Sequence, residues 1–531
     1  MRQSSPARCL GRGAVIGAAL FLVGATIAAA SWSEDAALNT AISDLAGDMI
    51  QPKLAPTPDG GAYISWLGNP GGGYNVYLQR VDEAGELQWN EPLLVADRSF
   101  SSTQDYGLSL DTSGNALLAF RDDRTSGIQI TAARIAPSGD FLWSEDGVQL
   151  SDGDDFKAAP RIVGTSDGGA AVAWTNNNDA RIVRLDAAGR VQWDDLLTQA
   201  GANGFSPAGL LAEDAGGTTG QVIVPLVQQG GFTTPRHVYG QKYDANGNRL
   251  WGDPALLVDD LGSLQFGNFP SFVGDGAGGM VISWYFTSPL QCYVQHVNAA
   301  GTLVFGPAVA TSTNLSQTRS APDVDYDPVA GEIYVFWRET DQFQNNPGVY
   351  GQRLSAAGER LWGDNGLELV PLGSPDRTQV RTLVDGAEVF AFHAEEIAPA
   401  RRHYRAARLD ASGKSVWRDT TLEVATADSQ KGRLQVALSA AGFAMLAWED
   451  DRGGSNDIYA QNLSAHGSLG PVDRPGLTGD LNGDGVVDVF DLLILLDAWG
   501  ACPEGEACPA DLDGNHEVNV FDLLILLDHW G

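Results

Sequence analysis

Residues 160–194 read PRIVGTSDGGAAVAWTNNNDARIVRLDAAGRVQWD. Short runs of apolar and small residues are separated here by Gly- and Asp-rich turns, which is the pattern of four short antiparallel strands. The turn D-x-x-G, or a close variant of it, recurs in steps of 50 to 58 residues and ends at Gly85, Gly139, Gly189, Gly247, Gly301, Gly358, Gly413 and Gly467. The chain is therefore read as eight copies of one unit.

Two aromatic series mark the same unit. Four residues after each turn glycine except the last stand Trp89, Trp143, Trp193, Trp251, Phe305, Trp362 and Trp417. Upstream lies a second series, from which only the fourth unit, GQVIVPLVQQ, departs: Trp66, Phe120, Trp174, Trp284, Trp337, Phe392 and Trp448. A strand containing Y-x-Q lies between the two series in five units. Four strands in about 54 residues, repeated, are typical of a β-propeller blade, with a linear β-solenoid as the alternative.

The eighth unit lacks an aromatic residue after its turn. At the other end of the chain, SWSEDAALNTAI from Ser31 aligns with LWSEDGVQLSDG from Leu142, which places Trp32 beneath Trp143. We expect this N-terminal segment to supply the last strand of the eighth blade, because a ring closed by both chain ends leaves no exposed sheet edge. The alternative is a stray tryptophan in a flexible terminus. The predicted fold is mainly β, an eight-bladed propeller of four-stranded blades.

The first thirty residues resemble a secretory signal. Arg2, Arg8 and Arg12 precede an apolar run from Ala14 to Ile27, and three alanines then offer a cleavage site. An uncleaved membrane anchor is the alternative, but the run is short, and no second apolar span follows. The net charge of −34 argues against a nucleic-acid or anionic-membrane partner. We expect an exported bacterial protein, secreted or held at the cell surface.

The propeller sequence contains no recognisable catalytic motif. Its aromatic residues are first of all packing residues, so a function is expected in the loops after the second strand of each unit. RDDRTSG, EDDRGGSND and RETDQFQNNPG are candidates, although their Asp and Arg more often form pairs that stabilise turns. The unit resembles a family of secreted bacterial propeller-like repeats over about residues 32–470, with GFAMLAWEDDRGGSNDIYAQNLSAHG as the best copy. That resemblance implies a binding or scaffold role and no defined reaction.

The composition changes after a Pro/Gly linker. Residues 473–531 hold 13 Asp and Glu against one Arg, and the segment FDLLILLD occurs twice, at 490–497 and 521–528. Each copy follows a loop with oxygen ligands at calcium-loop spacing. In the first loop the ligands are Asp480, Asn482, Asp484, the carbonyl of Val486, Asp488 and Asp491, with Gly485 at the sharp turn. The sequence therefore predicts a Ca²⁺ site.

This ending resembles a type I dockerin over residues 479–531. Asp instead of Glu at position 12, and no helix before the loop, both match that module. The resemblance implies that calcium folds the module and that its helices bind a cohesin partner. It divides the chain into a signal peptide (1–30), a propeller (31–470), a linker (471–478) and the dockerin-like domain (479–531).

The second calcium loop departs from the pattern. Its ligands would be Asp511, Asp513, Asn515, the carbonyl of Glu517, Asn519 and Asp522. His516 stands where the first loop has glycine, and a left-handed conformation there costs about 1–2 kcal/mol for a residue with a Cβ atom. The second loop also has three carboxylates where the first has four. We expect two Ca²⁺ sites, the first binding more tightly.

The two helices are apolar around most of their circumference, more than one buried stripe needs. We expect one face to pack the two copies together and another to bind a partner through Val489, Phe490, Val520 and Phe521. The dockerin's partner-reading positions fall on these residues, where small hydroxyl residues are often found instead. A self-contained tail or sorting signal is the alternative.

Cys502 and Cys508 flank PEGEA, a spacing that suits a small disulfide loop. They could also bind metal, but no nearby Cys or His completes a tetrahedral set.

These observations lead to a preferred function and an alternative. The first is a non-enzymatic binding or scaffold protein, whose propeller presents a surface for a glycan or protein ligand and whose dockerin-like module tethers it to a cohesin-type partner or to the cell surface. In the second, the propeller is a glycan-active enzyme, a glycoside hydrolase or polysaccharide lyase, carried by a dockerin.

Overall fold

The structure is a computed structural model, and it describes most of the chain. The described residues are 31–43, 45–99, 105–199, 203–230, 234–265, 267–373, 375–471, 478–479, 481, 487, 489–502, 508–513 and 515–530. The expected signal peptide therefore lies outside the described residues. A helix able to cross a membrane is not found in the described part of the chain.

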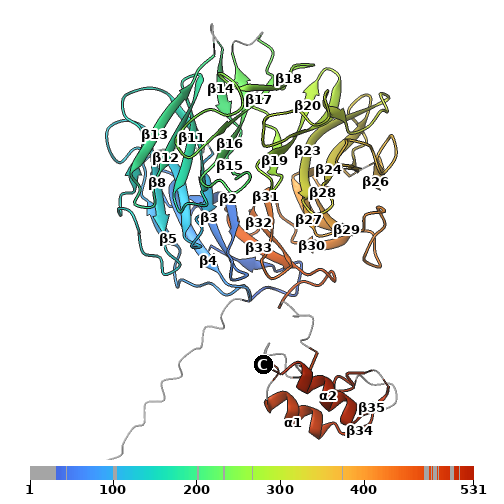
Figure 1. Cartoon of the computed structure of the whole chain (residues 1–531). Helices are drawn as coiled ribbons and strands as arrows, with labels where there is room; N and C mark the ends of the chain where they lie inside the picture. The colour runs from blue at the N-terminus through green and yellow to red at the C-terminus, as the bar shows by residue number, and fades with distance from the viewer. Residues whose placement is uncertain are drawn as a thin grey trace, which may run out of the picture.

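Eight antiparallel sheets form the body of the molecule (Figure 1), and the first four use strands of residues 48–259. Blade one contains β2 (Asp48–Pro56), β3 (Ala62–Asn69), β4 (Asn75–Val81) and β5 (Leu93–Ala96). Blade two contains β6 (Gly107–Leu110), β7 (Ala116–Asp122), β8 (Gln129–Ile135) and β9 (Val148–Gln149). Blade three contains β10 (Lys157–Gly164), β11 (Ala170–Asn176), β12 (Asp179–Leu185) and β13 (Val191–Leu197). Blade four contains β14 (Gly204–Pro207), β15 (Leu211–Ala212), β16 (Val222–Gln229), β17 (Val238–Tyr243) and β18 (Leu256–Asp259).

The other four sheets complete the set. Blade five contains β19 (Ser271–Gly274), β20 (Met280–Thr287), β21 (Leu290–Val297) and β22 (Val309–Ala310). Blade six contains β23 (Gln317–Asp327), β24 (Glu332–Asp341), β25 (Gly348–Leu354) and β26 (Leu367–Val370). Blade seven contains β27 (Arg377–Asp385), β28 (Glu388–Ala398), β29 (Arg401–Leu409) and β30 (Leu422–Ala425). Blade eight contains β31 (Lys431–Leu438), β32 (Ala444–Asp450), β33 (Asp457–Leu463) and β1 (Thr40–Ala41).

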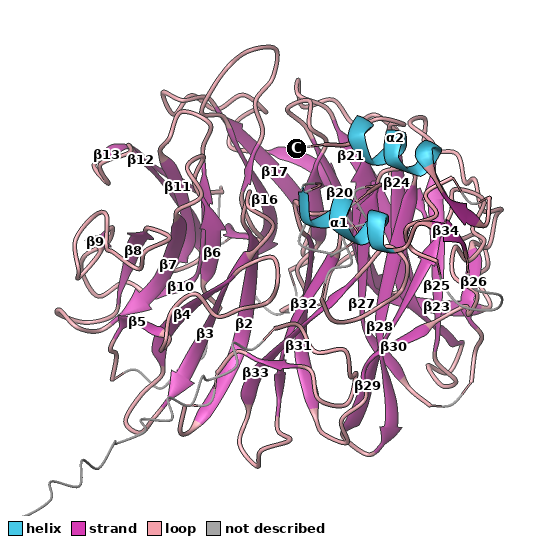
Figure 2. Cartoon of the chain, turned by 90° about the horizontal axis from the view of Figure 1, so that it is seen from below, coloured by secondary structure: helices cyan, strands magenta, loops and turns pink. Residues whose placement is uncertain are grey.

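The first strands of neighbouring blades contact one another all the way round, with β2 lying against both β6 and β31. Seen after a 90° turn, the sheets stand side by side with their strands along a common direction (Figure 2). The predicted eight-bladed propeller is confirmed, with one difference. The inner edge of blade four is split into β14 and β15, which both pair with β16.

The N-terminal segment completes blade eight, as expected. Thr40 pairs with Ala460 in β33, and Trp32 is buried between blades eight and one beside Met49 and Phe443. The Trp32 indole N–H donates to the carbonyl of Glu83 over 2.8 Å. Both ends of the chain therefore contribute strands to one sheet.

The Trp32 bond is one of a series that joins each blade to the next. In seven of the eight junctions an indole N–H donates over 2.8–3.1 Å to the carbonyl of the second residue in the neighbouring D-x-x-G turn. The donors are Trp32, Trp89, Trp143, Trp193, Trp251, Trp362 and Trp417. Phe305 takes the remaining position and packs on the Gly358 turn without such a bond. The recurring tryptophans therefore position blades, as a packing role requires.

The glutamine of Y-x-Q holds the loop that carries this tryptophan. Its side-chain amide donates to the carbonyl one residue after the aromatic in four blades, including Gln352 to Gly363 over 2.7 Å and Gln461 to Ser33 over 2.7 Å. In blade one, Gln79 donates to Trp89 itself. Each of these glutamines is fully buried, so the bonds satisfy groups that water does not reach.

The second aromatic series lies on the second strands, and one assignment is wrong. Trp66 and Trp337 face Tyr77 and Tyr350 across their sheets, but the register of β28 places His393, not Phe392, at this position in blade seven. Successive side chains of a strand point to opposite faces, so Phe392 packs on the other side of its sheet. In blade four the position is Leu226, opposite Tyr239.

Candidate metal and partner-binding site

The C-terminal segment forms a small unit of two helices, α1 (Val489–Asp497) and α2 (Val520–Asp528), and a two-stranded sheet, β34 (Gly500–Ala501) with β35 (Glu517–Val518). Its core consists of five buried residues: Val487, Leu495, Ala510, Val518 and Leu526. Leu495 and Leu526 are at the same place in the two copies of FDLLILLD. The helices contact each other, so each copy covers part of the other's apolar surface.

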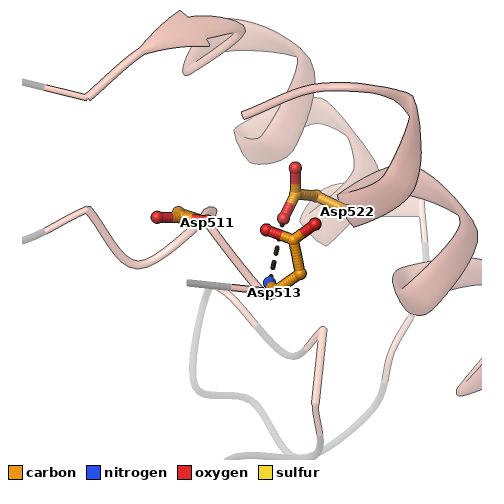
Figure 3. A group of neighbouring side chains, drawn as sticks. All are labelled: Asp511, Asp513 and Asp522. Carbon is orange, nitrogen blue, oxygen red and sulfur yellow. Dashed lines mark hydrogen bonds between the residues drawn. The ribbon is translucent and has the colours of Figure 1, made fainter. Parts of the chain in front are cut away.

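Three carboxylates of the second loop converge (Figure 3). One oxygen from each of Asp511, Asp513 and Asp522 lies within 4.8 Å of the others. Oxygen donors of this kind are those that Ca²⁺ prefers, and three carboxylates without a neighbouring cation repel one another. The donor chemistry of these residues therefore fits calcium.

Main-chain donors fix the innermost carboxylate. Asp522 is fully buried in the first turn of α2, and its Oδ1 accepts from the N–H groups of Leu512 over 2.7 Å and Asp513 over 3.1 Å. Its Oδ2 accepts from Asn519, which caps the same helix in a reciprocal capping box. Burial raises the pKa of Asp522, but these N–H groups together outweigh it and hold the pKa below its ordinary value.

The other predicted ligands of this loop lie around the three carboxylates. Asp511 accepts from the backbone N–H of Asn515 over 3.0 Å and of His516 over 2.8 Å, which curls the loop around it. His516 is left-handed, with φ +70°, and its carbonyl accepts from Cys502 N–H over 3.0 Å. Glu517 is exposed at the start of β35. A glycine would adopt the same conformation at position 516 without strain.

Most of the first loop lies outside the described residues: Asp480, Asn482, Asp484, Gly485, Val486 and Asp488. Its last predicted ligand, Asp491, is described and fully buried in the first turn of α1. Asp491 Oδ1 accepts from Leu481 N–H over 2.7 Å, as Asp522 accepts from Leu512. The two loops therefore hold their final carboxylate in the same way.

The remaining face of each helix is exposed and apolar. The predicted partner-binding residues Val489, Phe490, Val520 and Phe521 are 50%, 60%, 50% and 62% exposed. Further exposed apolar residues follow them: Leu493, Ile494 and Leu496 on α1 with Trp499 just after its end, and Leu524 and Leu527 on α2 with Trp530 just after its end. The sequence analysis named only the first two residues of each helix as partner-binding. Most of the other exposed apolar residues are identical in the two copies, and this identity could have identified them.

The described cysteines fall into two environments. Cys502 and Cys508 are joined by a disulfide across the expected loop. Cys292 is a free thiol, fully buried in β21, and burial raises its pKa well above the ordinary value. Its packing among apolar residues explains its place in the blade.

The candidate loops of the propeller are occupied by their own contacts. Arg124 forms a bidentate pair with Asp122, and Arg452 bonds Asp450 as well as the carbonyl of Leu38. Asp341 accepts from the N–H groups that follow it in its turn. These Asp and Arg side chains therefore stabilise turns and, at Arg452, the N-terminal segment.

No protein-family model matches this chain, and no curated protein matches it. Solved structures do match. The polysaccharide lyase Uly1 is 10% identical, with 81% of this chain and 92% of that chain covered, at a TM-score of 0.41. The Dos1 propeller is 11% identical, with coverage of 78% and 93%, at 0.42. An α-L-arabinofuranosidase from Fusarium graminearum is 11% identical, with coverage of 57% and 92%, at 0.33. The neighbours include enzymes, and identities this low bear on the fold alone.

Proposed function

We propose that this is an exported, non-enzymatic binding protein, whose propeller presents a ligand and whose C-terminal unit is a calcium-folded, dockerin-like tether. The observation that carries the proposal is the pair of identical apolar helix faces that remain exposed after the unit has packed its core. Exposed apolar faces of this kind mark interaction sites. The partner we propose is a cohesin-like protein of the cell surface or of a secreted assembly.

Two features of the propeller support a binding role over the glycan-active alternative. The Asp and Arg residues of its candidate loops are engaged in turn contacts, the repeated Trp side chains join neighbouring blades, and the repeated Gln side chains hold the loops that carry them. The proposal places the mature chain outside the cell, starting near Ser31. Trp32 is already part of the fold, so the propeller begins where the proposed leader ends.

The test is a capture experiment with the mature chain as bait against the envelope and secreted proteins of the producing cell. We expect one protein to bind in calcium and to be released by chelator. Because the two helix faces are alike, Phe490→Ala or Phe521→Ala alone should leave binding in place, since the partner can use the other copy. The double variant should abolish capture.

Phe343→Ala is the matched control, because Phe343 is a phenylalanine of the propeller that is 73% exposed. Capture that survives the double Phe490→Ala/Phe521→Ala variant would contradict the proposed surface. If the unit folds with calcium but captures no protein, the tether is refuted, and the unit is instead a stabilising tail or a sorting signal.

A further inference from the structure

The innermost strands of five blades share a bulge. The register shifts by an extra residue in β2, β10, β23, β27 and β31, and one residue of each bulge is left-handed: Gln51, Ala159, Ala321, Gln379 and Arg433. A bulge re-aims the side chains around it. The first paired residues after the shift are Lys53, Arg161, Asp323, Arg381 and Gln435.

Several of these side chains surround a cavity of about 270 Å³, which we call the axial cavity. Its lining comes from blades one, two, seven and eight: Gln51, Pro52, Lys53, Asp105, Arg381, Arg433 and Gln435. Three of these residues are cations and one is a carboxylate. In a chain with 67 acidic and 33 basic residues, such a lining is the reverse of the average surface.

Elsewhere in the propeller the third strands carry a basic residue that faces an acidic residue of its own blade. Six blades have such a pair: Arg80–Asp59, Arg134–Asp111, Arg184–Asp167, His296–Asp275, Arg353–Glu332 and Arg408–Asp385. At the axial cavity the one lining carboxylate is shared. Asp105 bonds Lys53 over 2.7 Å and Arg161 over 2.8 Å.

The other two cations of the lining are not neutralised by a carboxylate of the cavity. Arg381 donates to the main-chain carbonyls of Val380 over 2.8 Å and Leu434 over 3.1 Å. Two acidic groups beside these arginines, Asp323 and Glu449, already accept hydrogen bonds from other groups, which for Asp323 include the Ser271 hydroxyl over 3.0 Å. Asp323 accepts from Thr382 N–H over 2.7 Å, and Glu449 accepts from Gln51 N–H over 2.9 Å.

Charge at these two acidic groups is also disfavoured by their surroundings. Burial raises the pKa of Asp323 and of Glu449, and neither Arg381 beside the first nor Arg433 beside the second reverses the shift. The lining itself holds three basic side chains against one carboxylate, so an anion that enters the cavity gains Coulomb energy there.

We propose that the axial cavity binds a small organic oxyanion, a carboxylated molecule of about the size of one sugar ring. This inference names a ligand class for the binding role proposed above and rests on it. The guanidinium groups of Arg381 and Arg433 offer planar forks that match a carboxylate. The amides of Gln51 and Gln435 suit the hydroxyl groups of such a molecule. A volume just below the range of drug-sized pockets accommodates one ring and not a polymer chain.

The test is calorimetric titration of the mature chain with galacturonate, with galactose as its neutral counterpart, and with inorganic sulfate. We expect galacturonate to bind, galactose not to bind, and sulfate to compete. Affinity should fall with added salt, because mobile ions screen the cations.

The chain itself supplies conservative variants. Gln435 is the residue of blade eight that corresponds to Arg381, and Gln51 and Gln379 correspond to Arg433 with the same left-handed backbone. Arg381→Gln and Arg433→Gln therefore install residues that sister blades already tolerate. Each should weaken galacturonate binding at least about tenfold, since a charge-assisted hydrogen bond is lost. Arg418→Gln, at an exposed position of blade seven, is the control for loss of charge and should have no effect.

Galacturonate should bind more tightly than sulfate, because sulfate lacks the ring that fills the cavity, and sulfate binding as tightly as galacturonate would overturn the assignment to a carboxylated ring. Galactose binding as tightly as galacturonate, no binding of either anion, or unchanged affinity in the Arg381→Gln/Arg433→Gln double variant would overturn the inference. Its failure is separable from failure of the tether. Partner capture without anion binding refutes only the cavity, and anion binding without partner capture refutes only the tether.

Discussion

Repetition serves different ends in the two parts of this chain. The eight blades share few residues, and most of those serve the junctions: Trp32 and Trp89 donate to the neighbouring blade, and the buried Gln352 holds the loop that carries Trp362. The two tail copies share every residue of FDLLILLD, including positions that stay exposed. Phe490 and Phe521, for example, are 60% and 62% exposed. Identity at buried sites is explained by packing, whereas identity at exposed apolar sites is what the proposed partner-binding face predicts.

If the repeated residues of the blades serve packing, removal of Trp32, which closes the ring, should lower the free energy of unfolding strongly. Trp32→Ala should destabilise the propeller by about 3–5 kcal/mol, because it removes a large buried side chain and opens the junction between blades eight and one. Chemical denaturation of the mature chain measures the change. Leu38→Ala, in the same segment but 65% exposed, should stay within about 0.5 kcal/mol. Equal effects of the two changes would make the N-terminal segment an accessory to the fold.

In blade seven a histidine, His393, occupies the position of the second aromatic series, so a side chain that can be protonated is buried there. Burial lowers the pKa of His393 to about 3, and Arg377 and Arg405 add to the shift. As the pH falls, the unfolded chain, with a histidine pKa of about 6.5, is protonated at this residue before the folded chain is. The neutral His393 therefore contributes its full share to the free energy of unfolding above pH 6.5, and that share is lost as the pH falls toward 3.

Between pH 7 and pH 5 the loss from His393 amounts to about 2 kcal/mol. His393→Phe, which copies Phe120 of blade two, should remove that part of the pH dependence. Denaturation curves of both proteins at the two pH values give the difference. Parallel pH profiles would show that the ring is protonated in the native state as readily as in the unfolded chain.

The two predicted calcium loops of the tail should differ in their affinity for Ca²⁺. The first loop has one more carboxylate and a glycine at its sharp turn, so it should bind Ca²⁺ at least about tenfold more tightly than the second. Calcium titrations of Asp480→Ala and Asp511→Ala isolate one loop each, and Asp480→Ala should cause the larger loss of affinity. Equal losses in the two variants would refute the ranking.

The smallest expected effect is at His516. Because this residue is left-handed, at φ +70°, His516→Gly should relieve strain of about 1 kcal/mol and strengthen calcium binding by the second loop. His529→Gly is a poor control because His529 is the C-cap residue of α2, whereas His516→Asn keeps a Cβ atom and should recover part of the gain. A variant that binds calcium less tightly than the parent would show that the His516 side chain itself supports the loop.

The fold could be predicted because the same unit repeats along the chain. The strand register of blade seven and the lining of the axial cavity could not, because the first depends on the length of one hairpin turn and the second on contacts between residues far apart in the sequence. The blade count and the role of Trp32 follow from aligning units, because each blade must offer the same junction. Phe392 was misassigned because the β27–β28 hairpin turns on only two residues, Gly386 and Ala387, so counting from a neighbouring unit misses the register. Lys53 and Arg433 line one cavity although they are 380 residues apart in the sequence, and neither belongs to a recognisable local motif.

In the tail, ligand spacing located the second loop, and Asp511, Asp513 and Asp522 do meet in space. The full apolar face was underestimated, because which residues the two helices bury depends on how they contact each other. Leu493 and Leu495 look alike in sequence, yet the first is 57% exposed and the second is fully buried.

The pairing of Thr40 with Ala460 also sets the order of events in folding. At roughly 5–20 residues per second, the ribosome makes β33 roughly 20–80 s after β1. The first strand of the chain to be synthesised is thus the last to find its partner, and no sub-array of blades can form this junction. Contacts so distant in sequence form slowly. Blade eight can accordingly be completed only after β33 has been made, because β33 is the strand with which β1 pairs in this fold.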